Sequence, residues 1–316
     1  MSDWRPAASA GVLKLRAKLF HEARRFFAER DVLEVDTPAL GVSTAFDVHL
    51  SSLETRLSGA GPGRFYLQTS PESFMKRLLA AGSGSIYQFA RSFRNGEVGR
   101  LHNPEFVMLE WYRVGIDLPE LMDEVESLAS RLLGGGAPAV RLSYRQAFER
   151  FVGMDPFTAS AEDIAETCHQ LGLGGPARDR TEGLDLILSR RVQTAISPRR
   201  TFLYDFPPEQ AAMAKVRREQ PPVASRFEYF IEGVEIANGY DELDDAGEQA
   251  RRMAANAETR RRTGLPVPPV DQRLLDALEH GLPPCCGVAL GFDRVVMLAA
   301  GKDDVRAVMP FPVDRC

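Results

Sequence analysis

Apolar residues recur at helical spacing near the start of the chain, and this periodicity returns in later segments. The first run predicts an amphipathic helix over residues 11–30, on the apolar positions Val12, Leu15, Leu19, Ala23, Phe26 and Phe27. A Ser-Pro-Glu start signal and a Gly-Gly-Gly stop mark two further helices. These two helices are 70–82 and 118–133. Two more helices are predicted nearer the C-terminus, at 244–262 and 271–280.

Strands are predicted where apolar runs or alternating apolar residues lie between polar loops. The expected strands are 31–38, 46–50, 86–94, 105–114, 201–206 and 226–238, and a strand-turn-helix pattern covers 287–300. Irregular alternation of strands and helices predicts an α+β fold, with a mainly antiparallel sheet flanked by helices. We interpret about 118–200 as a mostly helical peripheral insertion in a single domain, 1–316, because this stretch lacks a catalytic signature.

The composition is ordinary for a globular enzyme, with 44% hydrophobic and 26% charged residues in 316. No apolar run approaches the ~20 residues of a membrane helix, and the N-terminus has no signal-peptide pattern. We therefore expect a cytoplasmic protein without membrane association. The net charge of −5 argues against a broad nucleic-acid-binding surface. Free thiols are expected at the four cysteines, Cys168, Cys285, Cys286 and Cys316.

The first segment that could carry chemistry is a predicted hairpin with Arg94 at the end of its first strand. A guanidinium matches phosphate oxygens in a bidentate way. Alternation along the returning strand places four residues on one face: Phe106, Met108, Glu110 and Tyr112. The alternative is a surface hairpin with solvated charges.

The second segment is residues 287–294, Gly-Val-Ala-Leu-Gly-Phe-Asp-Arg. Small residues on a strand let a ligand approach the backbone. We predict that Asp293 caps the helix that follows and that Arg294 projects from its first turn. The alternative is a glycine-bearing buried strand before a core helix.

The third segment is acidic. If Glu232 and Gly233 form a two-residue turn, Phe230 lies opposite Glu235, and Glu228 shares a hairpin face with Glu235. Paired carboxylates on one face suit a hard divalent cation such as magnesium. The alternative is a pair of solvated acids on an exposed face.

Three segments, in chain order, resemble the signature motifs of the class II aminoacyl-tRNA synthetases. Asp36-Thr37-Pro38 resembles motif 1, the dimer element; residues 93–112 resemble motif 2, and residues 287–294 resemble motif 3. The lysyl branch is indicated by Ser-Pro-Glu at 70–72, His-Asn-Pro-Glu-Phe at 102–106 and Glu-Ile-Ala-Asn-Gly at 235–239. The resemblance covers nearly the whole chain and implies the class II catalytic core.

Lysyl-tRNA synthetases carry an anticodon-binding OB-fold before this core. Here about ten residues precede the first predicted helix, too few for five strands, so we expect no OB-fold and no stable tRNA binding. A core-only lysyl enzyme resembles the ligases that attach (R)-β-lysine to elongation factor P. This implies ATP, Mg²⁺, β-lysine or lysine, and elongation factor P as reaction partners of an AMP-forming ligase that is a homodimer.

The resemblance also implies roles for individual residues. Arg94 and Arg294 are the implied catalytic residues, and adenine would stack between Phe106 and Arg294. The implied ATP-binding residues are Arg94, Gly96, Glu97, His102, Asn103, Phe106, Glu235, Ile236, Gly291 and Arg294. The implied substrate-binding residues are Ser70, Pro71, Glu72, Tyr112, Asn238, Glu242 and Ala289. Magnesium would be held by Glu228 and Glu235.

Two positions depart from the synthetase pattern. Motif 2 of the synthetases has Arg-Asn-Glu-Gly, whereas residues 94–97 read Arg-Asn-Gly-Glu, so the glutamate is displaced by one position and its role stays open. The lysyl enzymes have glycine where this chain has Ala289. A methyl group there narrows the amino-acid pocket, which is consistent with specificity for a β-amino acid.

Two other functions remain as alternatives. One is a truncated lysyl-tRNA synthetase-like enzyme that charges tRNA; the expected lack of an OB-fold and the presence of Ala289 count against it. The other is a non-catalytic paralogue that binds an amino acid and regulates a partner. Four retained residues count against that function: Arg94, Glu228, Glu235 and Arg294.

Overall fold

The computed structural model describes residues 4–59, 63–173, 179–197 and 199–316, in two compact units. Unit 1 comprises Met1–Ile116, Ser127–Gly135 and Leu243–Cys316. Unit 2 comprises Asp117–Glu126 and Gly136–Glu242. Within the described ranges, no helix combines the length and the apolar character that crossing a membrane requires.

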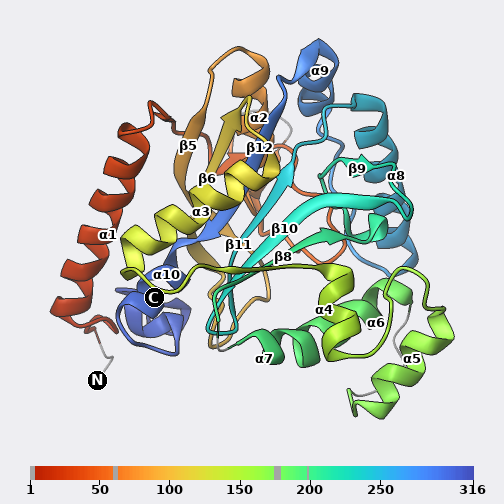
Figure 1. Cartoon of the computed structure of the whole chain (residues 1–316). Helices are drawn as coiled ribbons and strands as arrows, with labels where there is room; N and C mark the ends of the chain where they lie inside the picture. The colour runs from red at the N-terminus through yellow and green to blue at the C-terminus, as the bar shows by residue number, and fades with distance from the viewer. Residues whose placement is uncertain (1–3, 60–62, 174–178, 198) are drawn as a thin grey trace. The chain divides into compact units, whose positions relative to one another are not determined.

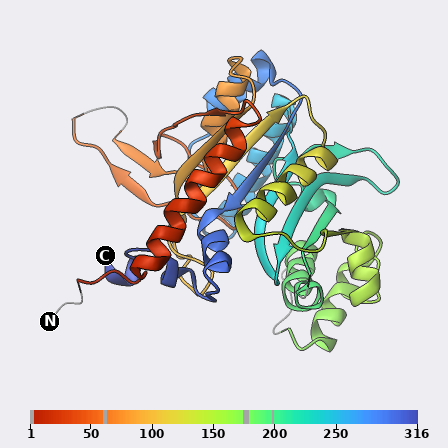
Figure 2. The same ribbon diagram turned by 60° about the vertical axis from the view of Figure 1, so that its left-hand side comes forward.

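The main sheet of unit 1 has the strand order β1-β5-β6-β12. β1 (Leu33–Glu34) runs parallel to β5 (Ile86–Phe93), whereas β5, β6 (Glu105–Val114) and β12 (Cys285–Gly291) pair antiparallel. A smaller sheet contains β2 (Leu40–Gly41), β3 (Glu54–Arg56) and β4 (Arg64–Leu67), and Figure 2 shows β3 and β4 extending away from α1 and β5. The helices of unit 1 are α1 (Ala10–Ala28), α2 (Glu72–Ala80), α8 (Ala246–Arg262), α9 (Gln272–Gly281) and α10 (Phe292–Ala299), with 3₁₀ turns at Val305–Val308 and Val313–Arg315.

The strands of unit 2 have the order β11-β10-β8-β7. β8 (Thr201–Phe206), β10 (Val223–Ile231) and β11 (Val234–Asp241) pair antiparallel, β7 (Val140–Ser143) is parallel to β8, and β9 (Val216–Arg217) pairs with β10. Figure 1 shows its helices gathered at one side of β8. They are α4 (Tyr144–Phe151), α5 (Ala161–Gln170), α6 (Arg180–Ile187) and α7 (Gln193–Ile196), with a π-helical turn at Leu188–Val192 and a 3₁₀ turn at Pro208–Gln210. α3 (Leu118–Leu133) starts in unit 2 and ends in unit 1.

The core of unit 1 is an aromatic layer between α1 and one face of the sheet. The ring of Phe27 stacks on Tyr87 with centroids 4.2 Å apart and meets the edge of Trp111 at 5.3 Å. Phe20 lies 4.7 Å from Phe89 of β5 by ring centroid. The helical spacing of apolar residues in the sequence therefore serves to bury one stripe of α1 against β5 and β6.

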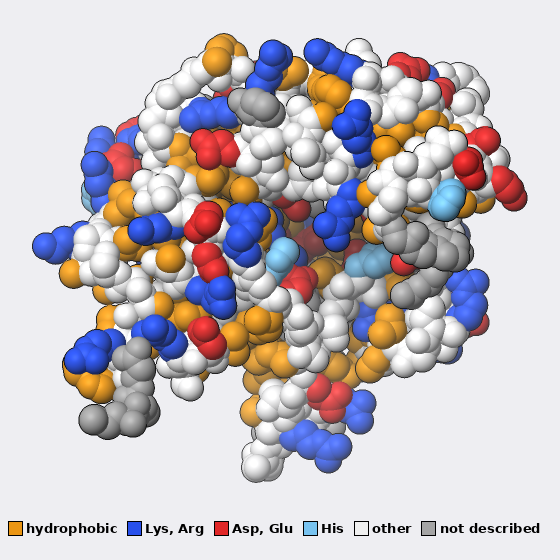
Figure 3. Space-filling model, turned by 90° about the horizontal axis from the view of Figure 1, so that it is seen from below, with side chains coloured by type: hydrophobic (Ala, Val, Ile, Leu, Met, Phe, Trp, Pro, Cys, Tyr) orange, Lys and Arg blue, Asp and Glu red, His pale blue; other side chains and the backbone are white. Residues whose placement is uncertain are grey.

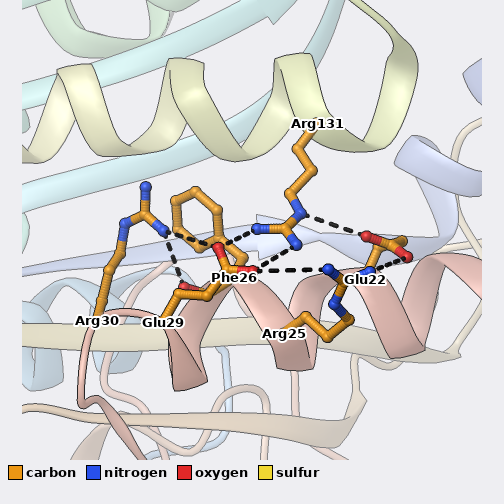
Figure 4. A network of polar contacts seen from close by, with 6 residues as sticks. All are labelled: Glu22, Arg25, Phe26, Glu29, Arg30 and Arg131. Atoms are coloured by element: carbon orange, nitrogen blue, oxygen red, sulfur yellow. Dashed lines mark hydrogen bonds and ion pairs between the residues drawn. The ribbon is translucent and has the colours of Figure 1, made fainter.

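Ion pairs also tie α1 to the end of α3 that belongs to unit 1 (Figure 4). Arg131 places Nε 3.3 Å from a Glu22 oxygen and NH1 2.5 Å from a Glu29 oxygen. The hydrogen bonds that Arg131 donates to Glu29 are the main cause that raises the pKa of Arg131. Because solvent screens exposed pairs, this network fixes the orientation of the two helices more than it stabilises the fold.

The structure confirms the α+β class, the mainly antiparallel pairing and most predicted elements. The predicted strand at 46–50 is wrong, because the Asp47 carboxylate accepts the N–H of His49 at 2.7 Å and bends the chain into a turn. β7 lies at residues for which no strand was expected. The single-domain interpretation, with its insertion at about 118–200, stays a prediction.

Candidate active site

Three paired strands of unit 1 present a face of small and polar residues. In their register, Glu110 of β6 lies opposite Ala289 of β12, and Tyr112 lies opposite Gly287. Gln88 of β5 lies on the other side of Glu110. Directly paired residues point to the same face of a sheet. The aromatic layer covers the opposite face.

Glu110 is a buried carboxylate for which the sequence suggested no role. Its side chain is only 3% exposed, and the Tyr112 hydroxyl donates a hydrogen bond to Oε1 at 2.7 Å. The alternation along the strand had already placed Glu110 and Tyr112 on the same face. That shared face was the feature of the sequence that could have identified Glu110 as a site residue. The hydrogen bond from Tyr112 fixes the orientation of this buried carboxylate.

The loop between β5 and β6 gathers several predicted nucleotide-binding residues. The Arg94 backbone N–H donates to Pro104 O at 2.9 Å, and the Arg94 guanidinium lies 5.2 Å above the Phe106 ring centroid. Gly96 has a φ of 81°, which glycine adopts without steric cost. The turn brings Glu97 Oε1 to 3.9 Å from Arg94 NH1. The displaced glutamate of motif 2 therefore still lies beside the arginine.

Arg294 reaches the same loop from the first turn of α10, as predicted. Its Nε donates to Leu101 O at 3.3 Å, and its NH2 lies 2.9 Å from Nε2 of His102. A guanidinium has only donors, so Nε2 of His102 is the acceptor in this pair and Nδ1 carries the ring proton. A Cβ at Gly291 would lie 3.4 Å from Cδ of Arg294, so the glycine keeps space beside that side chain.

Asn103 ties this loop to the C-terminal segment. Its Oδ1 accepts the N–H of Val313 at 3.0 Å, and its amide group donates to Glu105 O at 2.6 Å. Both ends of the side chain are thus bonded to backbone. Its implied contact with ATP stays a prediction.

Asp293 does not cap α10, which corrects the sequence prediction. The N-cap position is Gly291, and no side chain caps the helix there. Asp293 lies inside the first turn, where it accepts from Arg16 at 2.6 Å and from the N–H of Val107 at 2.7 Å. The carboxylate therefore fixes α10 against α1 and β6.

The predicted substrate residues Ser70, Pro71 and Glu72 form the start of α2. Pro71 is the N-cap, and Ser70 Oγ accepts the N–H of Glu72 at 3.4 Å. Lys76, one turn later, is fully buried and places its ammonium 2.7 Å from Glu72 Oε1. This pair holds the Glu72 side chain in one orientation.

Unit 2 carries the predicted metal ligands. Glu232 and Gly233 have positive φ values of 51° and 73°, and Phe230 lies opposite Glu235, so the predicted hairpin is confirmed. Glu228 lies opposite Asn238 on the same pair of strands. Burial raises the pKa of Glu228 to about 7; Arg226 opposes this rise, and Glu235 adds to it.

Two carboxylates on one hairpin fit magnesium, which commonly takes one or two protein carboxylates and completes its shell with phosphate oxygens and water. Across the described ranges, no group of three or more His, Cys, Asp or Glu side chains could hold a metal ion by itself. The register shift after Tyr229 leaves Ile236 as an extra residue in β11, with its side chain buried. Glu242 follows β11 and is 1% exposed.

Charges are mixed on the molecular face in Figure 3. There the Lys and Arg side chains of the described residues are interspersed with Asp and Glu side chains. A surface that tracks a nucleic-acid backbone needs a continuous basic footprint instead.

Comparisons with known proteins point in one direction. The family "tRNA synthetases class II (D, K and N)" matches residues 1–315. The chain is similar to the elongation factor P–(R)-β-lysine ligases of Yersinia enterocolitica, Vibrio cholerae and Salmonella dublin, at 47%, 46% and 48% identity. Each match covers 99% of this chain and 98%, 99% and 98% of the respective relative.

Asp293→Ala tests the corrected role of this residue. Losing an N-cap costs about 1 kcal/mol, whereas removing one partner of a buried ion pair costs about 3–5 kcal/mol. We expect the larger loss in the free energy of unfolding, measured by chemical denaturation. Part of it should return in the Arg16→Met/Asp293→Ala double variant, because the guanidinium is then also gone. A loss near the smaller value would restore the capping role.

Proposed function

Since the chain belongs to the class II tRNA synthetases and, within them, to the elongation factor P–(R)-β-lysine ligases, we propose that it activates (R)-β-lysine with ATP and joins it to elongation factor P. The observation that carries the amino-acid part is the buried Glu110–Tyr112 pair beside Ala289. The Glu110 carboxylate can pair with an ammonium group of the substrate, and Ala289 next to it is small enough to leave space for a ligand.

The reaction has two steps. The substrate carboxylate attacks the α-phosphorus of ATP, which gives an aminoacyl-adenylate and pyrophosphate. The ε-amine of a lysine on elongation factor P then attacks the acyl carbon, an amide forms and AMP leaves. Neither step needs a side-chain nucleophile, so the protein acts by positioning and by neutralising charge.

The loop residues are assigned to ATP. Arg94 and Arg294 neutralise phosphate charge, Gly96, Glu97, His102 and Asn103 shape the loop, and Gly291 leaves room for the nucleotide. Because Arg94 covers one face of Phe106, adenine stacks on the other face, between Phe106 and Arg294. Ile236 contributes backbone groups only, since its side chain is buried.

The remaining assignments concern the amino acid and magnesium. Glu72, Tyr112 and Glu242 bind the ammonium groups, and to these we add Glu110. The rest of the amino acid is placed by Ser70, Pro71, Asn238 and Ala289. Glu228 and Glu235 would hold Mg²⁺, which would supply positive charge to the phosphates.

We also propose that the enzyme is a cytoplasmic homodimer. Motif 1 lies in the region from Phe26 to Pro38, and the exposed edge strand β1 offers a surface there. The four cysteines are free, as suits a reducing compartment. Sedimentation velocity at micromolar concentration should show a dimer, and a monomer would contradict the assignment.

The function itself is tested with the purified chain, ATP and Mg²⁺. We expect pyrophosphate exchange with (R)-β-lysine in preference to α-lysine, and a mass increase on elongation factor P but not on tRNA. Arg294→Ala is the matched control and should lose exchange while its melting temperature is kept. Charging of tRNA instead would favour the synthetase alternative, and no exchange with either lysine would favour the non-catalytic paralogue.

Ala289→Gly should shift preference toward α-lysine. The Ala289 methyl lies beside Glu110 in the register, so its removal enlarges the pocket where an α-amino group must fit. One methylene-sized difference is worth about 1–3 kcal/mol, or roughly 10- to 200-fold. Pyrophosphate exchange with both isomers, in wild type and variant, measures the ratio. An unchanged ratio would remove Ala289 from the specificity determinants.

A further inference from the structure

Arg226 of β10 joins two of the residues proposed to face ligands. Its Nε donates to Oδ1 of Asn238 at 3.2 Å, and its NH2 donates to Oε1 of Glu228. Its NH1 donates to Gln210 O at 2.7 Å. The guanidinium also lies 4.4 Å above the Phe206 ring centroid. With a side chain 15% exposed and all three nitrogens engaged, Arg226 has one fixed position.

This contact determines which way the Asn238 amide points. An amide offers an oxygen acceptor on one side and an N–H donor on the other, and rotation by half a turn exchanges them. A guanidinium can only donate, so Asn238 must turn its oxygen toward Arg226. Its two N–H donors therefore point to the other side, where an acceptor such as a carboxylate is bound best.

The same guanidinium also determines which carboxylate oxygen of Glu228 is better placed to bind a metal ion. Oε1 accepts a hydrogen bond from Arg226, so Oε2 is the better ligand for a metal ion. Glu228 can then act as a ligand through one oxygen. A magnesium ion with near-octahedral geometry favours such single-oxygen contacts from a fixed carboxylate.

We infer that Arg226 is a positioning residue that makes Asn238 a hydrogen-bond donor to the substrate carboxylate and Glu228 a one-oxygen ligand of the metal. The inference rests on the ligand roles given to Asn238 and Glu228 in the proposed function. One rigid side chain thereby aligns amino-acid recognition with metal binding.

Lysine cannot replace this side chain. The three acceptors are met by three different nitrogens of one planar group. A lysine ammonium is a single nitrogen on a flexible stem, so it cannot hold the amide and the carboxylate together.

Asn238→Asp is the sharpest test, because it keeps the shape of the side chain and still gives Arg226 an acceptor. The fold should survive, but the group that faces the substrate changes from donor to acceptor. We expect affinity for (R)-β-lysine, measured by calorimetry, to fall roughly 10- to 100-fold, the range for a hydrogen bond to a charged group. Binding of Mn²⁺ with a non-hydrolysable ATP analogue, followed by electron paramagnetic resonance, should not weaken, because the new carboxylate lies opposite Glu228 and adds negative charge near the metal.

Arg226→Lys should weaken binding of both probes, and the Mn²⁺ resonance should change because Glu228 is no longer held through one oxygen. Arg217→Lys is the matched control in the same unit. Arg217 also makes three side-chain hydrogen bonds, to Asp205, Glu219 and Ser225, and none of these residues has a proposed ligand role. The control should leave both affinities unchanged.

The outcomes separate the inference from the proposed function. Wild-type enzyme that binds (R)-β-lysine while Asn238→Asp binds it equally well overturns the donor role. Unaltered Mn²⁺ affinity and resonance in a folded Arg226→Lys variant overturn the metal role. Wild type that binds neither lysine isomer contradicts the proposed function, and the Mn²⁺ comparison of Arg226→Lys with Arg217→Lys still decides the metal part of the inference.

Discussion

The candidate site depends on one constraint, the antiparallel register of β5, β6 and β12. Side chains alternate between the two faces of a strand, so a shift by one residue would exchange every position. The aromatic residues Tyr87 and Trp111 lock the register by packing against Phe27. Because Tyr87 and Trp111 point into the core, Glu110 and Ala289 must lie next to each other on the opposite face.

Charges within the two units are fixed by specific partners. Asp293 meets Arg16, Glu72 meets Lys76, and Glu228 meets Arg226. Such pairs add little net stability, because desolvation offsets most of their attraction, but they hold a side chain in one geometry. Two of the three pairs include a residue with a proposed ligand role. The fold thus places its charged groups in fixed orientations where a reaction that relies on positioning needs them.

The sequence predicted helices and strands better than it predicted which side chains contact one another. Local signals sufficed for α1 and for the Glu232–Gly233 hairpin, because periodicity and turn chemistry act within a few residues. The strand prediction at 46–50 was wrong because the Asp47 carboxylate accepts a backbone N–H and forms a turn. The alternation of apolar and polar residues carries no information about such a hydrogen bond. Asp293 failed for a different reason. Its partner Arg16 is distant in sequence, so only folding reveals that the carboxylate is used in the core.

Strand β6 also sets the separation between two groups of residues with proposed ligand roles. A strand rises about 3.3 Å per residue, so Phe106 and Glu110 are about 13 Å apart along β6, and Phe106 and Tyr112 about 20 Å. Phe106 lies beneath Arg94 at the start of the strand, and the Glu110–Tyr112 pair lies farther along the same face. The positive charge proposed for phosphates and the negative charge proposed for ammonium groups therefore lie at separate places on one strand. Under the proposed function, this separation favours one direction of binding for an amino acid, with its ammonium group at the Glu110–Tyr112 pair and its carboxylate toward Arg94.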